Sequence, residues 1–230
     1  MSQRDVGVVI VAGGSGSRVG GDELKQFRWV AGKPMLLHSV QAFMARPDVG
    51  MVVVVLPQRH AGDPPPWLFQ CDVDRLLVSI GGRTRSESVA NGLEDLPDEA
   101  EIVLVHDAAR PLVGAATIER VVAAVRAGQS VVAALPQVDT IKKVDDDGRI
   151  LRTVSREGLW RAQTPQGFPR QVIVEAHRRA RAERVSATDD AALLERLGMA
   201  VHVVRGSERA LKVTEPDDFA RVDALFASDE

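Results

Sequence analysis

A cluster of glycines follows the first apolar segment of the sequence and could bind a phosphate group. Residues 6–11 are short, apolar and followed by glycines, which predicts a strand buried on both faces. The next residues, 12–18, are A-G-G-S-G-S-R. Glycine lets backbone N–H groups approach an anion closely, and a helix beginning near Ser17 would direct its positive end to the same point. The stretch predicts an anion-binding loop flanked by the cations Arg18 and Lys25.

Spacing excludes two more common glycine-rich loops. A dinucleotide-binding loop needs G-x-G-x-x-G, whereas the glycine that follows Gly14 and Gly16 comes only at Gly20. A P-loop needs G-x-x-x-x-G-K-[ST], but Gly21 is followed by aspartate. A glycine-rich turn with solvated Arg and Lys side chains remains the alternative for this stretch taken alone.

A carboxylate and further cations occur at the predicted ends of later strands. Asp107 follows an apolar segment, where a carboxylate could hold a divalent metal ion or a substrate hydroxyl; capping the next turn is the alternative. Six cations fall in predicted loops: Arg18, Lys25, Arg85, Arg110, Arg156 and Lys212. A chain with a net charge of -3 has little structural reason to gather them. We infer a ligand with several phosphates, neutralised by these cations and by a divalent metal such as Mg²⁺.

Covalent catalysis and zinc binding have no candidate in the sequence. No Ser or Cys lies in a nucleophile elbow, and no His, Cys or Asp spacing matches a zinc site. His106 is interpreted as a half-buried structural residue. Thr188, Asp189 and Asp190 are interpreted as the start of a helix. The single cysteine, Cys71, excludes an internal disulfide and fits a reducing compartment.

Length and composition indicate one globular domain. The chain has 230 residues, of which 45% are hydrophobic, enough for a sizeable core. Its net charge of -3 gives no basic field for nucleic acid or an anionic membrane surface. We see no apolar run near ~18 residues and no charged-then-apolar leader, so we expect no membrane partner and a cytoplasmic protein.

The elements that must position these residues alternate between strands and helices. Strands are predicted at 6–11, 51–56, 76–80, 102–105, 130–135 and 201–204, and helices at 35–45, 86–93, 117–127, 169–181, 189–197 and 215–226. Residues 57–72 are predicted to lie outside the core. The alternation predicts an α/β fold, a doubly wound and mainly parallel sheet with helices on both sides. Ligands bind beyond the carboxyl ends of such strands, so loops 13–18, 81–88 and 107–110 should meet at one crevice.

An inserted β-hairpin arm interrupts this alternation at residues 136–160. Strands are predicted at 140–144 and 149–154, because the D-D-D-G sequence between them is a strong turn signal. A lone hairpin is marginally stable in water. Its apolar residues Ile141, Val144, Ile150 and Leu151 therefore need a partner surface, from the same chain or from a second copy. We predict a homodimer formed through this arm.

Seven motifs, in order along nearly the whole chain, resemble the 2-C-methyl-D-erythritol 4-phosphate cytidylyltransferase family. They lie at residues 12–18, 24–27, 81–89, 105–111, 139–142, 156–160 and 163–168. The resemblance implies a single Rossmann-like nucleotidyltransferase domain over residues 1–230 and a dimer with crossed arms. The implied reaction joins CTP and 2-C-methyl-D-erythritol 4-phosphate to give 4-diphosphocytidyl-2-C-methyl-D-erythritol and pyrophosphate, in non-mevalonate isoprenoid biosynthesis.

The resemblance also implies a role for individual residues. The implied catalytic residues are Arg18, Lys25 and Lys212. The implied nucleotide-binding residues are Ala12, Gly13, Gly14, Ser15, Gly16, Gly81, Gly82, Arg85 and Ser88. The implied acceptor-binding residues are Asp107, Arg110, Thr140, Arg156 and Thr164, with Asp107 also able to contact a metal ion bound to the CTP phosphates. The acceptor phosphate is already an anionic nucleophile, so no general base is needed.

Two other functions remain open at this point. Ribitol 5-phosphate cytidylyltransferases share the fold and the CTP site, but Ala109 and the R-E-G-L-W sequence at 156–160 favour the methylerythritol phosphate enzyme. A nucleotide-binding regulator that has lost catalysis is the third hypothesis. The presence of Arg18, Lys25 and Asp107 argues against it.

Overall fold

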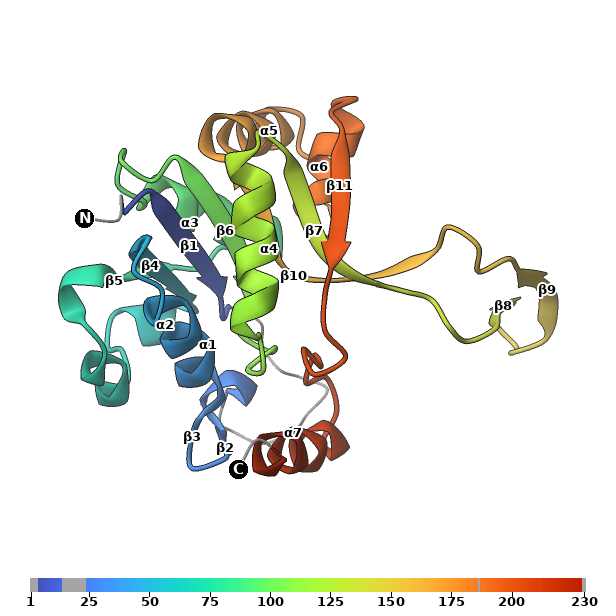
Figure 1. Ribbon diagram of the computed structural model, residues 1–230, viewed down its shortest axis with the longest axis horizontal. Coiled ribbons are helices and arrows are strands. Elements are labelled where there is room, and N and C mark those ends of the chain that lie inside the picture. Colours follow the sequence, from blue (N-terminus) through green and yellow to red (C-terminus); the bar gives the residue numbers. More distant parts are fainter. Residues whose placement is uncertain (1–3, 14–23, 186, 229–230) are drawn as a thin grey trace.

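A seven-stranded sheet forms the centre of the molecule (Figure 1). The computed structural model describes residues 4–13, 24–185 and 187–228. The strand order is β11-β7-β10-β6-β1-β4-β5. The bounds are β1 (Val6–Val11), β4 (Val49–Leu56), β5 (Leu76–Ile80), β6 (Ile102–Asp107), β7 (Ser130–Pro136), β10 (Trp160–Pro169) and β11 (Val201–Arg205). Only β10 runs antiparallel to its neighbours, β6 and β7, so the predicted doubly wound and mainly parallel sheet is confirmed.

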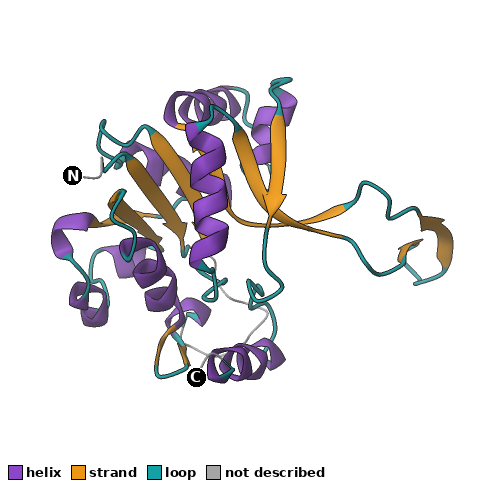
Figure 2. Cartoon of the chain, viewed as in Figure 1, coloured by secondary structure: helices purple, strands orange, loops and turns teal. Residues whose placement is uncertain are grey.

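Helices cover both faces of the sheet (Figure 2). One face is covered by α1 (Met35–Met44) and α4 (Ala115–Arg126), and the other by α3 (Arg85–Glu94), α5 (Arg170–Ala182) and α6 (Ala191–Arg196). The shorter elements are β2 (Trp29–Val30), β3 (Lys33–Pro34), α2 (Gln58–Ala61) and the 3-10 helices η1 (Lys25–Phe27), η2 (Pro66–Gln70) and η3 (Val73–Arg75). The last helix, α7 (Asp217–Ala227), packs beside β2. Among the described helices, none is long and apolar enough to cross a bilayer.

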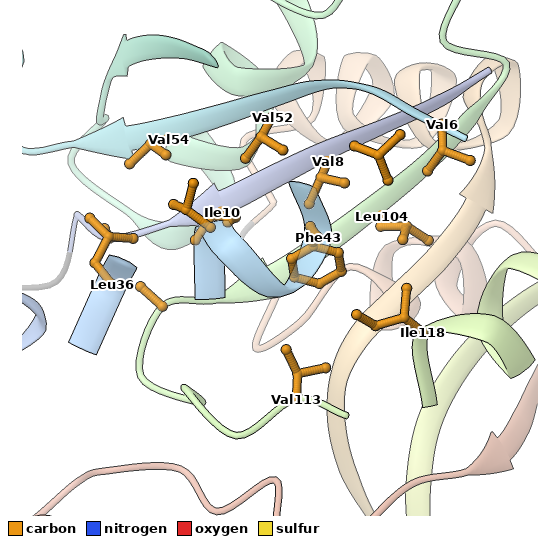
Figure 3. Close-up of a cluster of buried hydrophobic side chains, with 14 of the residues drawn as sticks. Val6, Val8, Ile10, Leu36, Phe43, Val52, Val54, Leu104, Val113 and Ile118 are labelled. Carbon is orange, nitrogen blue, oxygen red and sulfur yellow. The ribbon is translucent and has the colours of Figure 1, made fainter. Parts of the chain in front are cut away.

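The central strands are apolar on both faces because both faces are buried. Val8 and Ile10 of β1 pack in the cluster that contains Phe43 of α1 and Ile118 of α4 (Figure 3). Val9, whose side chain points the opposite way, packs in the second cluster with residues of α3 and α5. This two-sided burial explains why the sequence shows a continuous apolar run and not an alternating one.

Strand β10 is the main element that the sequence patterns do not predict. Its residues Q-T-P-Q-G-F are mostly polar and contain proline and glycine, which argue against a central strand. Gly167 is required by packing, since a Cβ there would lie 2.4 Å from Cγ1 of Val121 in α4. The buried polar side chains Gln163, Thr164 and Gln166 are instead used for hydrogen bonds to neighbouring segments.

Several local predictions are corrected by the structure. Strand β6 extends to Asp107, two residues beyond its predicted end. Helix α3 begins at Arg85, so this cation is not in a loop. Helix α4 begins after Gly114, which places Thr117, the expected N-cap, inside the helix. Leu68 is fully buried, so residues 57–72 do contribute to the core.

The hairpin forms a separate two-stranded sheet that projects from the central sheet (Figure 1). Its strands are β8 (Ile141–Val144) and β9 (Ile150–Val154), which pair antiparallel as predicted. In the single chain, Val144 is 48%, Ile150 58% and Leu151 55% exposed. These three side chains are therefore largely uncovered by their own chain, whereas Ile141 is half-buried.

Candidate active site

The ends of three strands come together at one edge of the sheet. The backbone N–H of Ala108, after β6, donates to the carbonyl of Val11 in β1 at 3.1 Å. A Cβ at Gly13, after β1, would lie 3.3 Å from Oγ of Ser88 in α3. The predicted meeting of these loops is thus confirmed for their described parts. The rest of the first loop, with Gly14, Ser15, Gly16, Arg18 and the helix expected near Ser17, lies outside the described residues.

Ser88 holds the backbone of the turn after β5. It is 3% exposed, and its Oγ accepts a hydrogen bond from the N–H of Gly82 at 3.1 Å. The same hydroxyl donates to the carbonyl of Thr84 at 2.9 Å. The Ser88 hydroxyl therefore donates its proton to a hydrogen bond within the protein. Gly82, in contrast, is exposed at this turn.

Asp107 lies between two cations at the end of β6. Its Oδ2 accepts from Nζ of Lys212 at 2.7 Å, and its Oδ1 accepts from Nε of Arg85 at 3.3 Å. Burial by itself raises the pKa of Asp107, but the charges of Arg85 and Lys212 outweigh it and hold the pKa well below its usual range. Asp107 is ionised at neutral pH and holds two cations in place.

Behind Asp107, Thr164 and His106 form a buried hydrogen-bond chain. Thr164 Oγ1 accepts from the N–H of Asp107 at 3.1 Å and lies 3.0 Å from Nδ1 of His106. His106 Nε2 lies 3.2 Å from the carbonyl of Arg110, which can only accept, so Nε2 carries the proton. Nδ1 is then the acceptor for the Thr164 hydroxyl. His106 is fully buried, more so than predicted, and burial lowers its pKa to about 4.

We expect the stability of the free protein to fall at mildly acidic pH because of His106. The unfolded chain takes up this proton near pH 6.5 and the folded protein only near pH 4, so protonation favours unfolding as the pH falls through this window. Between about pH 7 and pH 5 the loss should be about 2 kcal/mol. Urea unfolding of the wild type and of His106→Asn at both pH values measures it. Equal pH dependence in the two proteins would show that His106 does not titrate in this way.

Arg110 is anchored by backbone carbonyls and keeps one buried donor without a partner. Its Nη1 donates to Ala210 at 2.7 Å and its Nη2 to Ala162 at 3.3 Å. Within the described part of the chain, Nε of Arg110 and Nη2 of Arg85 are buried and make no hydrogen bond. A buried donor without a partner is costly, and an anionic ligand would complete both groups. These two atoms are therefore the candidate contacts for a phosphate-bearing ligand.

The segment before α7 contains Lys212 and is hydrogen-bonded to Lys25. Lys25 Nζ donates to the carbonyl of Val213 at 2.8 Å, and the N–H of Val213 donates to the carbonyl of Ala109 at 2.8 Å. Lys212, adjacent to Val213, reaches Asp107 from the same segment. The structure therefore brings together most of the described predicted residues: Ala12, Gly13, Lys25, Gly81, Gly82, Arg85, Ser88, Asp107, Arg110, Thr164 and Lys212.

Thr140 and Arg156 are not brought into this group by their own chain. Both are exposed on the arm, and Nη1 of Arg156 donates to the carbonyl of Val138. Among the described residues, no hydrogen bond or ion pair joins either of them to Asp107 or Lys212.

The described residues of the site do not by themselves form a metal-binding cluster. No cluster of three or more His, Cys, Asp and Glu side chains in the described ranges could hold a metal ion. Each oxygen of Asp107 keeps lone-pair capacity beyond its contact with Arg85 or Lys212. Mg²⁺ is commonly bound by one or two carboxylates plus substrate phosphates. Asp107 can therefore serve as one protein ligand for a cation that arrives with phosphates.

A Rossmann-like sheet whose strand ends gather cations around one ionised carboxylate is the arrangement that a nucleotidyltransferase needs. The model of the family "IspD: 2-C-methyl-D-erythritol 4-phosphate cytidylyltransferase" matches residues 6–228. The chain belongs to the 2-C-methyl-D-erythritol 4-phosphate cytidylyltransferase family. The resemblance found in the motifs is confirmed, and the ribitol phosphate and regulator hypotheses are not favoured.

Relatives match this chain over nearly its whole length. The 2-C-methyl-D-erythritol 4-phosphate cytidylyltransferase of Salinibacter ruber is 44% identical, covering 95% of this chain and 92% of the relative. The enzyme of the same name from Streptomyces coelicolor is also 44% identical, covering 95% of this chain and 84% of the relative. The crystal structure of the Thermus thermophilus enzyme of that name superimposes with a TM-score of 0.79 at 33% identity, covering 95% and 98%. The crystal structure of the Anaerococcus prevotii 4-diphosphocytidyl-2C-methyl-D-erythritol synthase superimposes with a TM-score of 0.83 at 26% sequence identity, covering 96% of both chains.

The polar residues that hold the site from behind were not predicted from the sequence. Gln163 exchanges hydrogen bonds with Ser207, Gln166 binds the backbone of Asp190, and Asp190 pairs with Arg85. The predicted helix start at Asp189 and Asp190 is close, since α6 begins at Ala191, but it did not reveal the ion pair. The two glutamines of the Q-T-P-Q-G-F motif were the sequence signal that could have indicated these buried hydrogen bonds.

Proposed function

We propose that the chain transfers the cytidylyl group of CTP to 2-C-methyl-D-erythritol 4-phosphate, a step of non-mevalonate isoprenoid biosynthesis. The observation that carries this proposal is the set of cations around Asp107, in which Arg85 and Arg110 each keep a buried N–H group for a ligand. Family membership supports both substrates. The products are 4-diphosphocytidyl-2-C-methyl-D-erythritol and pyrophosphate.

The chemistry requires charge stabilisation and positioning more than proton transfer. An oxygen of the acceptor phosphate attacks the α-phosphorus of CTP, and the bond from that phosphorus to the leaving pyrophosphate oxygen breaks. The attacking oxygen is already anionic, and Asp107, with its depressed pKa, is a poor base. We assign Arg18, Lys25 and Lys212 to the charge that develops at the α-phosphorus. Asp107 and Arg110 would bind the acceptor, with Thr164 holding Asp107 in place.

A divalent cation belongs to this proposal as a partner of the CTP phosphates. Asp107 would be its protein ligand. When bound, Mg²⁺ neutralises phosphate charge and so lowers the repulsion between the two substrates.

An assay of pyrophosphate release tests the proposed function. Wild-type protein is incubated with CTP, Mg²⁺ and either 2-C-methyl-D-erythritol 4-phosphate or ribitol 5-phosphate. We expect turnover with the first acceptor and little with the second. Preference for ribitol 5-phosphate would replace the proposed acceptor, and CTP binding without turnover with either would favour the regulator.

We further propose that two chains exchange their arms and that each active site is shared between them. Val144, Ile150 and Leu151 on the arm are uncovered in the single chain, and a hairpin of this size needs a packing surface. Thr140 and Arg156 lie on the arm and make no described contact with Asp107 of their own chain. In the dimer they would reach the acceptor phosphate in the neighbouring chain.

Mixed dimers of Lys25→Met and Arg156→Ala chains are expected to recover activity. Each homodimer is inactive, but a mixed dimer has one site with both defects and one site with neither. Random pairing makes about half of the dimers mixed, so the mixture should reach about a quarter of wild-type activity. Co-expression with two different tags and purification of the doubly tagged dimer should raise this to about half.

The matched control places both substitutions in one chain and pairs it with a wild-type chain. If the sites are shared, this dimer has one defect in each site and should be inactive. If each chain completes its own site, this dimer keeps about half of the activity and the first mixture stays inactive. That reversed pattern would refute the shared site.

We propose a cytoplasmic location and no nucleic-acid or membrane partner. The net charge of -3 gives no basic field for such surfaces, and the single cysteine fits a reducing compartment. Fractionation of cells expressing the tagged protein tests the location.

A further inference from the structure

Arg85 is held between two carboxylates that come from distant parts of the sequence. Its Nε donates to Oδ1 of Asp107 at 3.3 Å, and its Nη1 donates to Oδ2 of Asp190 at 2.8 Å. The third nitrogen, Nη2, is buried and makes no hydrogen bond within the described residues. A guanidinium group is planar, so fixing Nε and Nη1 also fixes the direction in which Nη2 points.

Asp190 is itself held firmly and lies out of reach of a substrate. Its side chain is 1% exposed, and its Oδ1 accepts from Nε2 of His177 in α5 at 2.9 Å. Its backbone N–H donates to Oε1 of Gln166 in β10 at 3.1 Å. Burial raises the pKa of Asp190, but the charge of Arg85 and the hydrogen bond from His177 outweigh it, and the pKa is lowered. Asp190 is thus a buried, ionised group that can influence the site through its ion pair with Arg85.

Asp107 cannot orient Arg85 without help. Its carboxylate is shared with Lys212, which lies closer at 2.7 Å. If Asp190 lost its charge, the guanidinium could turn until Nη2 also paired with Asp107, and that donor would no longer be available to a ligand. The shorter contact, to Asp190, is the one that keeps Nη2 free.

We propose that Asp190 is a positioning residue for nucleotide binding, which acts through Arg85 by keeping Nη2 directed at the phosphates of CTP. This inference rests on the proposed function, in which Arg85 binds the nucleotide. Gln166 and His177 support Asp190 from β10 and α5.

Asp190→Asn keeps the shape of the side chain and removes its charge. The Kd for CTP, measured without acceptor, and the KM for CTP should both rise about tenfold, which corresponds to ~1.4 kcal/mol. The kcat should stay within about threefold and the KM for the acceptor should not change. Unchanged CTP affinity in folded Asp190→Asn would overturn the proposal, as would a loss confined to kcat.

Asp48→Asn is the matched control. Asp48 is also a buried carboxylate with two arginine partners, Arg46 and Arg126, but it precedes β4 at the opposite edge of the sheet. Its loss should lower stability and leave CTP affinity unchanged. If both variants weakened CTP binding equally, the effect would be one of general destabilisation and the proposal would fail.

A double-mutant cycle tests whether Asp190 acts through Arg85. In an Arg85→Met background, Asp190→Asn should raise the Kd for CTP no further, whereas independent effects would multiply. If Asp190→Asn does not fold, Gln166→Met loosens the anchor of Asp190 and keeps both charges, and it should raise the Kd about threefold. Independent effects in the cycle, or no change in Gln166→Met, would overturn the proposal.

CTP binding and pyrophosphate release by the wild-type protein distinguish a failure of this inference from a failure of the proposed function. If wild-type protein neither binds CTP nor releases pyrophosphate, both fall. If it does both and Asp190→Asn matches it, only the role of Asp190 falls.

Discussion

Replacing Lys25 by methionine is expected to lower kcat about a hundredfold or more, with the KM for CTP changed by less than about threefold. Lys25 Nζ is held by the carbonyl of Val213, in the segment that also carries Lys212. The same short segment, residues 212–213, therefore carries one lysine of the site and binds the other. A charge that acts on the transition state more than on bound CTP changes turnover and leaves ground-state affinity nearly intact.

Steady-state kinetics with both substrates varied, together with CTP binding at equilibrium, measure this effect. Lys33→Met is the matched control, because Lys33 is an exposed lysine whose Nζ donates to Gln41 at 2.8 Å, away from the strand ends that form the site. It should leave kcat unchanged. An effect of Lys25→Met seen only in the KM for CTP would assign the residue to substrate binding and contradict the proposed role.

Removing divalent cations is expected to reduce activity to background, and adding Mg²⁺ in excess of the chelator should restore it. Asp107 is shared with Arg85 and Lys212, and no larger cluster of metal-binding side chains occurs in the described segments. The cation should therefore depend on the CTP phosphates for binding. The free protein should retain little metal after dialysis, which elemental analysis can check.

The chelation experiment needs evidence that the fold survives. Circular dichroism and the midpoint of urea unfolding should be the same with and without chelator, because Mg²⁺ has no structural role in this proposal. Full turnover in excess chelator, with the metal content shown to be negligible, would remove the cation from the mechanism.

The general architecture could be predicted because it depends on local patterns. Runs such as Val6–Val11 are short, apolar and followed by glycines, which is typical of a strand covered on both faces. The D-D-D-G turn determined the hairpin, and the position of Asp107 after an apolar run placed it at a strand end. These features need only neighbours in sequence and the rule that parallel strands end at a common edge.

Strand β10 could not be predicted because its stability comes from contacts with distant segments. Gly167 allows Val121 to pack closely, and Gln166 binds the backbone of Asp190. Contacts of this kind do not produce a periodic pattern of apolar residues in the sequence. A polar stretch with proline and glycine resembles a loop until the two strands that flank it are known.

The sequence by itself determined which residues are available for chemistry, the α/β architecture that gathers them and the family to which the chain belongs. Only the tertiary structure decided how those charges are paired. Arg85 and Asp190 are separated by 105 residues, as are Asp107 and Lys212. Both pairs meet because the segment before α6, which is bound by Gln166 of β10, and the segment before α7 return to the same edge of the sheet. Pairing at that range depends on distances in space, to which the spacing of residues along the chain gives no guide.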